Sequence, residues 1–118
     1  MSNAATLDHE LNQAILSGKA LEAFEKYYAE EIVMEEPGVE PHRGKDVNRK
    51  REQEFFSSVE AFHGAELLAS AVEGNTSFSQ WKWDVTLRGM GRILLEQVAV
   101  RTWRENQVVY ERFYYNKG

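Results

Sequence analysis

Residues 77–88 read SFSQWKWDVTLR, and this stretch decides the fold class. Large apolar residues alternate in it with polar ones, so that four side chains share one face: Trp81, Trp83, Val85 and Leu87. Strict alternation with a period of two predicts a β-strand that buries one of its faces. We therefore expect a long strand with two indoles on its inner side, where they are bulky enough to shape a ligand cavity.

Two further strands are predicted after this one. Gly89-Met90-Gly91 is a turn signal, and residues 92–104 then run back as RILLEQVAVRTWR. The pair Glu105-Asn106 makes a second turn, after which residues 107–115, QVVYERFYY, return once more. Three consecutive long strands joined by short turns predict an antiparallel meander.

The second turn also predicts which side chains share a face of the sheet. A two-residue turn at Glu105-Asn106 places Arg104 opposite Gln107. An unbroken register then pairs the residues of one face as follows: Thr102 with Val109, Val100 with Glu111, Val98 with Phe113, and Glu96 with Tyr115. This set is mainly aliphatic and aromatic, so we assign it to the core beside the tryptophans. A slip of one residue would exchange the two faces.

The opposite face of the last hairpin mixes aromatic and arginine side chains. Four of its residues have the composition that is typical of protein–protein interfaces: Trp103, Tyr110, Arg112 and Tyr114. We predict that they are buried against a second copy of the chain in a two-fold symmetric homodimer.

The N-terminal part of the chain predicts three helices. Thr6 is a candidate N-cap for the first, whose apolar stripe is Leu7, Leu11, Ala14 and Ile15; residues 1–5 are expected to be disordered or tag-derived. The second helix carries Leu21, Phe24 and Tyr28 at helical spacing and ends near Glu30. The third spans residues 45–60, and its predicted inner side is Val47, Phe55, Val59 and Phe62.

Short strands complete the expected fold. Residues 32–36 are rich in β-formers and end at Pro37, and residues 67–73 lead into the Gly74-Asn75 turn. Helices collected before an antiparallel sheet predict a single α+β domain over residues 1–118, with the helices on one face. A strongly curved sheet of this kind leaves a cleft, which we expect the Trp81 and Glu96 faces to line.

Composition limits the possible partners and cofactors. The chain has 118 residues, a formal net charge of −5 and no cysteine. An acidic chain is not expected to bind nucleic acid, and no apolar run approaches the roughly 20 residues of a membrane span. The histidines His9, His42 and His63 lie in separate elements without metal-ligand spacing, and no phosphate-binding loop is present. We expect a cytoplasmic protein without metal, cofactor, nucleic-acid or membrane partner.

Two segments carry a resemblance to a known family. Residues 27–37, YYAEEIVMEEP, are followed by Gly44 at the start of a helix, and the chain ends in VRTWR (100–104) and VVYERFYY (108–115). This arrangement resembles the nuclear transport factor 2-like superfamily, in its SnoaL-like branch. The resemblance implies a cone-shaped, cystatin-like α+β fold, often dimeric, with an apolar pocket between sheet and helices. Polyketide cyclases, ketosteroid isomerase, limonene epoxide hydrolase and scytalone dehydratase belong to this superfamily.

The resemblance points to Glu36 as a candidate general base. Ketosteroid isomerase has its catalytic carboxylate immediately before the proline that ends the first strand, which is the position of Glu36 here. The positions of its two oxyanion-stabilising groups fall at about Leu11 and Val98, which cannot donate hydrogen bonds, so ketosteroid isomerase activity is not expected. In an apolar cleft the pKa of Glu36 would rise towards the operating pH. The alternative is an exposed carboxylate before a loop proline.

Glu96 and Glu111 are the other candidate catalytic carboxylates. A buried carboxylate must find hydrogen-bond donors, and Tyr28, Tyr115 or Arg51 could supply them. The alternative is a wet, polar end of the pocket. The residues that we expect to line a ligand site are Tyr28, Met34, His42, Trp81, Trp83, Val98, Phe113 and Tyr115.

Three classes of function remain open at this point. The first is a cofactor-free isomerase, cyclase, dehydratase or hydrolase that uses carboxylates, and the second is a protein that binds a small apolar molecule without transforming it. The third is a dimeric association module whose cavity is filled by its own aromatic side chains. Glutamates on the inner face favour the first two classes, because a carboxylate there would be costly in a purely structural core.

Overall fold

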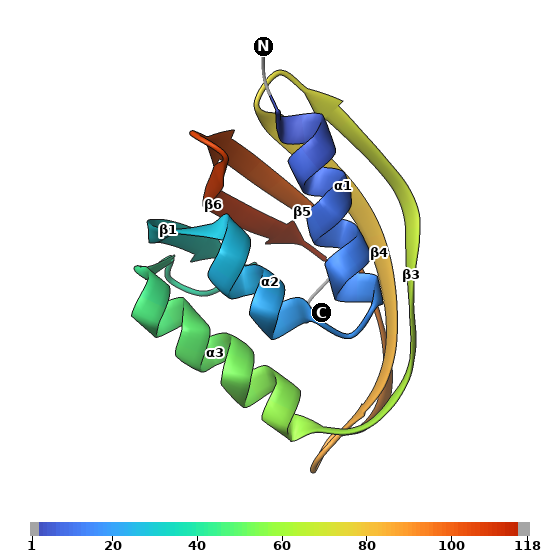
Figure 1. Cartoon of the computed structure of the whole chain (residues 1–118). Helices are drawn as coiled ribbons and strands as arrows, with labels where there is room; N and C mark the ends of the chain where they lie inside the picture. The colour runs from blue at the N-terminus through green and yellow to red at the C-terminus, as the bar shows by residue number, and fades with distance from the viewer. Residues whose placement is uncertain (1–2, 116–118) are drawn as a thin grey trace.

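The alternating segment forms one of the long strands of a curved sheet in the computed structural model, which describes residues 3–115 (Figure 1). The helices are α1 (Ala4–Leu16), α2 (Ala20–Tyr27) and α3 (Lys45–Ser58). The strands are β1 (Tyr28–Glu35), β2 (His42–Arg43), β3 (Val59–Glu73), β4 (Thr76–Leu87), β5 (Gly91–Arg104) and β6 (Gln107–Tyr114).

The strands form one sheet in the order β2-β1-β6-β5-β4-β3. Only β1 and β6 pair in parallel, and the other neighbours are antiparallel. The long strands β3 and β4 curve around one side of the molecule, and the three helices lie in the concavity (Figure 1). The prediction of an α+β fold with helices on one face of a curved, mainly antiparallel sheet is therefore confirmed.

The turn between β5 and β6 is the predicted two-residue hairpin. Glu105 and Asn106 have φ values of 51° and 68°, as a type I′ turn requires, and Arg104 pairs with Gln107. The register shifts immediately afterwards, because a β-bulge between Thr102 and Trp103 leaves one extra residue on β6. Thr102 therefore faces Tyr110 instead of Val109, and the predicted register is wrong from this point.

The bulge reverses the predicted faces of β5, and on β6 it places Val108 in the core instead of Val109, whereas Glu111 keeps its predicted inward side. Ala99, Arg101 and Trp103 point into the core, and Arg101 lies opposite Glu111. The set that was assigned to the core on β5 lies on the other face, with Glu96 exposed and paired with Lys82 of β4. The expected inward placement of Glu96 and Val98 is therefore wrong.

The main apolar core lies between α1, α2 and the strands β1, β5 and β6. It contains Leu11, Phe24, Tyr28, Met34 and Trp103. The stripe predicted for α1 packs against this core. The helix begins at Ala4, and its N-cap is Asn3 instead of the predicted Thr6. Residues 4 and 5 are thus helical, while residues 1 and 2 lie outside the described part of the chain.

Three other element predictions need correction. Helix α2 ends at Tyr27, so Tyr28 belongs to β1 instead of the helix, and β3 begins at Val59, well before residue 67. The predicted inner side of the third helix is also wrong in part, because Val47 and Phe62 are exposed. Its inward positions are 45, 48, 52, 55 and 56, where Lys45 and Asn48 are buried, so a polar stripe faces the interior. Within residues 3–115, no helix is long and apolar enough to cross a membrane.

Candidate functional site

A cavity of about 230 Å³ lies between the helices and the inner face of the sheet. Apolar side chains form most of its wall, among them Leu11, Ile15, Phe24, Met34, Trp81 and Phe113. Charged side chains reach the same space from β5, β6, α3 and the end of β1. The cavity therefore combines an apolar body with a few convergent polar groups, which is the usual composition of a small-molecule site.

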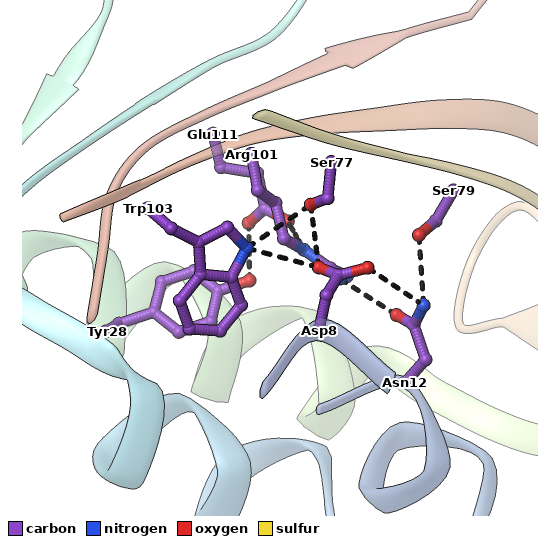
Figure 2. A network of polar contacts seen from close by, with 8 residues as sticks. All are labelled: Asp8, Asn12, Tyr28, Ser77, Ser79, Arg101, Trp103 and Glu111. Atoms are coloured by element: carbon purple, nitrogen blue, oxygen red, sulfur yellow. Dashed lines mark hydrogen bonds and ion pairs between the residues drawn. The ribbon is translucent and has the colours of Figure 1, made fainter. Parts of the chain in front are cut away.

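The sheet side of the cavity is closed by a buried charge network (Figure 2). Arg101 Nε donates to Glu111 Oε2 at 2.7 Å, and Arg101 Nη1 donates to Asp8 Oδ1 at 2.9 Å and to Asn12 Oδ1 at 2.8 Å. Arg101, Glu111 and Asp8 are only 2%, 1% and 2% exposed. Burial opposes the charge of Arg101, but its anionic neighbours outweigh burial and raise the pKa of the guanidinium.

Neutral donors complete this network. Ser77 Oγ donates to Asp8 Oδ1 at 2.7 Å, and Asn12 Nδ2 donates to Ser79 Oγ at 3.0 Å (Figure 2). Tyr28 Oη donates to Glu111 Oε1 at 2.7 Å, so both oxygens of this carboxylate are engaged. Burial, together with the charge of Glu111, raises the pKa of Tyr28, which keeps the phenol protonated as a donor.

The second polar region of the cavity is built from α3 and the end of β1. Glu36, which follows β1, pairs with Arg51 of α3 and accepts a hydrogen bond from Tyr115 Oη at 3.2 Å. Burial and the neighbouring Glu36 carboxylate raise the pKa of Tyr115. Glu36 thus lies against a guanidinium and a phenol, where apolar neighbours were expected.

Glu52 is the third carboxyl group of the cavity. It is half-buried on the inward stripe of α3 and lines the cavity, yet it has no hydrogen bond or ion pair with any residue between 3 and 115. Burial raises the pKa of Glu52 to about 7, the charges of Glu111 and Glu36 add to this effect, and Arg51 opposes it. A carboxyl group with this pKa can both accept and donate a proton near neutral pH.

Most of the expected site residues meet at the cavity. Those in its wall are Tyr28, Met34, Glu36, Trp81, Trp83, Glu111 and Phe113. Tyr115 reaches the site through its hydrogen bond to Glu36. Three expected residues are not part of the wall: Glu96, Val98 and His42. Glu96 and Val98 lie on the outer face because of the bulge, and His42 lies in β2, which pairs with β1 at the sheet edge.

Sequence reasoning missed four polar residues of the interior: Asp8, Asn12, Glu52 and Arg101. Asp8 lies near the start of the first helix, where an acidic residue suits the helix dipole, but it also lies three residues before Leu11 of the apolar stripe, and Asn12 follows Leu11 directly. Glu52 follows the basic residues Lys50 and Arg51, and a run of charges is typical of a solvated helix face. Its spacing of three and four residues from Phe55 and Phe56 is the signal that could have placed it inside. Among residues 3–115, no three His, Asp or Glu side chains gather as metal ligands.

Comparison with known proteins identifies the family. The family model of the SnoaL-like domain matches residues 2–115, so the chain belongs to the SnoaL-like family. No curated protein matches the chain.

Solved structures agree with this assignment. A SnoaL-like protein of Mesorhizobium loti is 27% identical, and the match covers 98% of this chain and 100% of that chain with a TM-score of 0.88. A SnoaL-like protein of Jannaschia sp. CCS1 is 12% identical, with 97% and 88% of the two chains covered and a TM-score of 0.78. A nuclear transport factor 2-like protein of Burkholderia pseudomallei, of unknown function, is 14% identical, with 98% and 92% covered and a TM-score of 0.77. The last two likenesses concern the fold alone.

Proposed function

We propose that this SnoaL-like protein binds a small, mainly apolar molecule in its cavity and acts on it by proton transfer through carboxyl groups, without a cofactor. The observation that carries the proposal is the cavity itself, an apolar space of about 230 Å³ that three carboxyl groups border. This volume is below the roughly 300–1,000 Å³ of pockets for drug-sized ligands, so the ligand is expected to be smaller than these. Isomerisation and elimination are the reaction types that need only proton transfer.

The second candidate function is binding without turnover. It is favoured by the pairing of two of the three carboxyl groups, because Glu111 and Glu36 are held by donors of the protein itself. Among the candidate bases, Glu36 remains a proposal, and replacing it with glutamine would abolish turnover but keep binding if it is the base. Loss of turnover in any cavity carboxyl variant would separate an enzyme from a binding protein.

Binding to the cavity can be tested with acetophenone, a small aromatic ketone, through the fluorescence of Trp81 and Trp83. We expect a saturable change in fluorescence, and Trp81→Phe and Trp83→Phe would locate it. Ala20→Phe should weaken binding at least about tenfold, because Ala20 lines the cavity and the added ring would fill it. Ala69→Phe, on the exposed side of β3, is the matched control. Equal binding by wild type and Ala20→Phe would contradict a ligand site in this cavity.

We also propose a homodimer that forms through the outer face of β4, β5 and β6. Trp103 cannot contribute as first expected, because it is buried in the core of its own chain. Support comes from the remaining surface: Phe78 is 40% exposed and lies opposite Val100, and Tyr114 is 49% exposed and stacks beneath Arg112. Exposed aromatic and arginine side chains of this kind are enriched at interfaces.

Sedimentation at tens of micromolar protein tests this assembly. We expect twice the chain mass of 13.6 kDa for the wild type. Phe78→Glu should shift the protein towards the monomer, because a carboxylate in the centre of an apolar interface would be left without a partner. A monomeric wild type at this concentration would contradict the proposal.

A further inference from the structure

The three carboxyl groups of the cavity differ in how many lone pairs they leave for a ligand. Tyr28 and Arg101 occupy both oxygens of Glu111, and Tyr115 and Arg51 occupy both oxygens of Glu36. Glu52 has no such partner among residues 3–115. Hydrogen bonds to an ionised carboxylate stabilise its charge and make it a weaker base. Glu52 is thus the cavity carboxylate that keeps its basic lone pairs.

The local structure of α3 places Glu52 in a defined position. Asn48, one turn earlier, is fully buried, and its Nδ2 donates to the carbonyl oxygens of His42 at 2.9 Å and Gly44 at 2.8 Å. Phe55 and Phe56, one turn later, line the same cavity. The stripe is therefore anchored at its N-terminal end and apolar at its C-terminal end, so the Glu52 carboxyl group is held at an apolar wall.

Charged groups surround Glu52 from β6, from α3 itself and from the residue that follows β1, whereas α1, α2 and β4 contribute only apolar side chains to the cavity. Glu111 of β6 and Glu36 after β1 oppose its negative charge, whereas Arg51 of α3 favours it. Tyr28 of β1 and Arg101 of β5 line the same cavity. Together with burial, this surrounding raises the pKa of Glu52 to about 7, so the group exchanges protons near neutral pH.

We propose that Glu52 is the proton-transfer residue of this cavity, and that its ligand is a small apolar molecule with an acidic C–H bond next to an electron-accepting atom. This inference rests on the proposed function. In the step, Glu52 takes the proton, and the electron pair of the C–H bond moves to the accepting atom of the same molecule. Return of the proton to a different carbon completes an isomerisation. In an elimination the electron pair instead expels a leaving group, and Glu52 passes its proton to the leaving group or to water. Neither route needs an oxidant or a reductant.

Arg101 is placed to stabilise the charge that develops. Its Nε and Nη1 are bonded within the network, whereas Nη2 has no hydrogen-bond partner among residues 3–115, although the side chain lines the cavity. A guanidinium N–H that is fixed before the reaction can donate to an oxygen that gains negative charge. The favoured ligand therefore carries an oxygen as its accepting atom.

The proposal can be tested with 5-nitrobenzisoxazole, a small flat molecule whose opening reports on a carboxylate base in an apolar site. The base removes the proton of the ring C–H, the freed electron pair forms the nitrile, and the N–O bond breaks to leave a coloured phenolate. We expect Glu52→Gln to lower kcat/KM at least about 100-fold. Glu54→Gln, on the exposed side of the same helix, should leave it unchanged.

The pH profile distinguishes Glu52 from its neighbour Glu36. The wild-type rate should rise with pH around a midpoint near 7, and Glu52→Gln should remove this step. Glu36→Gln should keep the step at a lower pH, because it removes a negative charge near Glu52 and frees Arg51 to favour the ionised form. A Glu52→Gln variant that keeps the rate, or a step that disappears only in Glu36→Gln, would overturn the proposal.

A binding measurement keeps this inference separate from the proposed function. Circular dichroism should first establish that Glu52→Gln is folded, and acetophenone binding should be measured for each variant. If the protein binds acetophenone but the rate of 5-nitrobenzisoxazole opening does not depend on Glu52, the Glu52 assignment is overturned and the ligand site is still supported. Absence of binding in the wild type would overturn both proposals.

Discussion

The two polar regions of the cavity differ in how their carboxyl groups are paired. On the sheet side, Arg101 lies between Asp8 and Glu111, and neutral donors supply the remaining hydrogen bonds. On the helix side, Glu52 borders the same cavity with no partner among residues 3–115. A fully paired network fixes the positions of its members, whereas an unpaired carboxyl group has a raised pKa and free lone pairs. The network on the sheet side is thus suited to a structural role, and Glu52 of α3 is the group to which we assign the proposed proton transfer.

The largest effect on stability is expected when the cation of the paired network, Arg101, is removed. Arg101→Met would leave Asp8 and Glu111 buried without their counter-ion, so we expect the free energy of unfolding to fall by about 3–5 kcal/mol. Urea denaturation followed by circular dichroism measures this loss. Arg104→Met is the matched control on the same strand, because the Arg104–Glu31 pair is exposed and should contribute little.

A double variant guards against the case in which Arg101→Met does not fold. Arg101→Met with Glu111→Leu removes one of the two stranded carboxylates and should recover part of the stability, because Asp8 keeps its neutral donors Ser77 and Trp103. A loss below about 1 kcal/mol in the single variant would show that the network is not rigidly paired.

Two tyrosines allow a matched comparison of the two regions, because each donates its hydroxyl hydrogen to a carboxylate. Tyr28→Phe removes a buried donor from Glu111 and should cost about 2 kcal/mol, since the carboxylate cannot find water instead. Tyr115→Phe removes a longer bond to the partly exposed Glu36 and should cost less than about 1 kcal/mol. Thermal or urea unfolding of both variants measures the difference. Equal losses of stability would contradict the distinction between the buried network around Glu111 and the more exposed region around Glu36.

Glu52→Gln is expected to raise stability instead of lowering it, and the effect should depend on pH. The pKa of Glu52 in the folded protein, about 7, lies above the ordinary value of 4.5, so the folded state binds more protons between these values. Its contribution is present below pH 4.5 and is lost as the pH rises through 7. Glutamine removes this loss, so the variant should be more stable than wild type by about 1–2 kcal/mol at pH 8, after allowance for solvent screening of a half-buried group.

The same pair of variants and conditions supplies the control. At pH 4 the two proteins should have nearly equal free energies of unfolding, because Glu52 is protonated in the folded state and about three-quarters protonated in the unfolded chain. If the difference did not grow between pH 4 and pH 8, the Glu52 side chain would have to be fully solvated.

The order of elements followed from local patterns, which is why it could be predicted. Period-two alternation marked β4 with the inward Trp81, and Glu105-Asn106 marked the type I′ turn. Tyr28, which donates to the buried Glu111, was one of the three donors expected for the inner carboxylates, because a buried charge requires a partner. These features depend on neighbouring residues or on a general cost of burial.

The faces of β5 could not be predicted in the same way. Alternation determines faces only within an unbroken register, and a single extra residue at the bulge reverses every later assignment. Because of this bulge, Trp103 and Arg101 of β5 share an inward face with Val108 and Glu111 of β6. The same bulge is the reason why Glu96 and Val98 lie on the outer face of the sheet and not in the expected site.

The sequence by itself determined the three helices, the meander and the aromatic side chains on the inner face of the sheet, because these depend on short-range periodicity and turn chemistry. The fold family followed from the resemblance of its segments to known proteins. Only the tertiary structure decided which charges are paired. Asp8 pairs with Arg101, which lies 93 residues away in the sequence, whereas Glu52 has no partner among residues 3–115. Asp8 and Glu52 are both acidic residues of helices, so their local sequence does not distinguish them. The energy of a buried charge depends on what lies within a few ångströms of it, and that neighbourhood is set by the packing of distant segments.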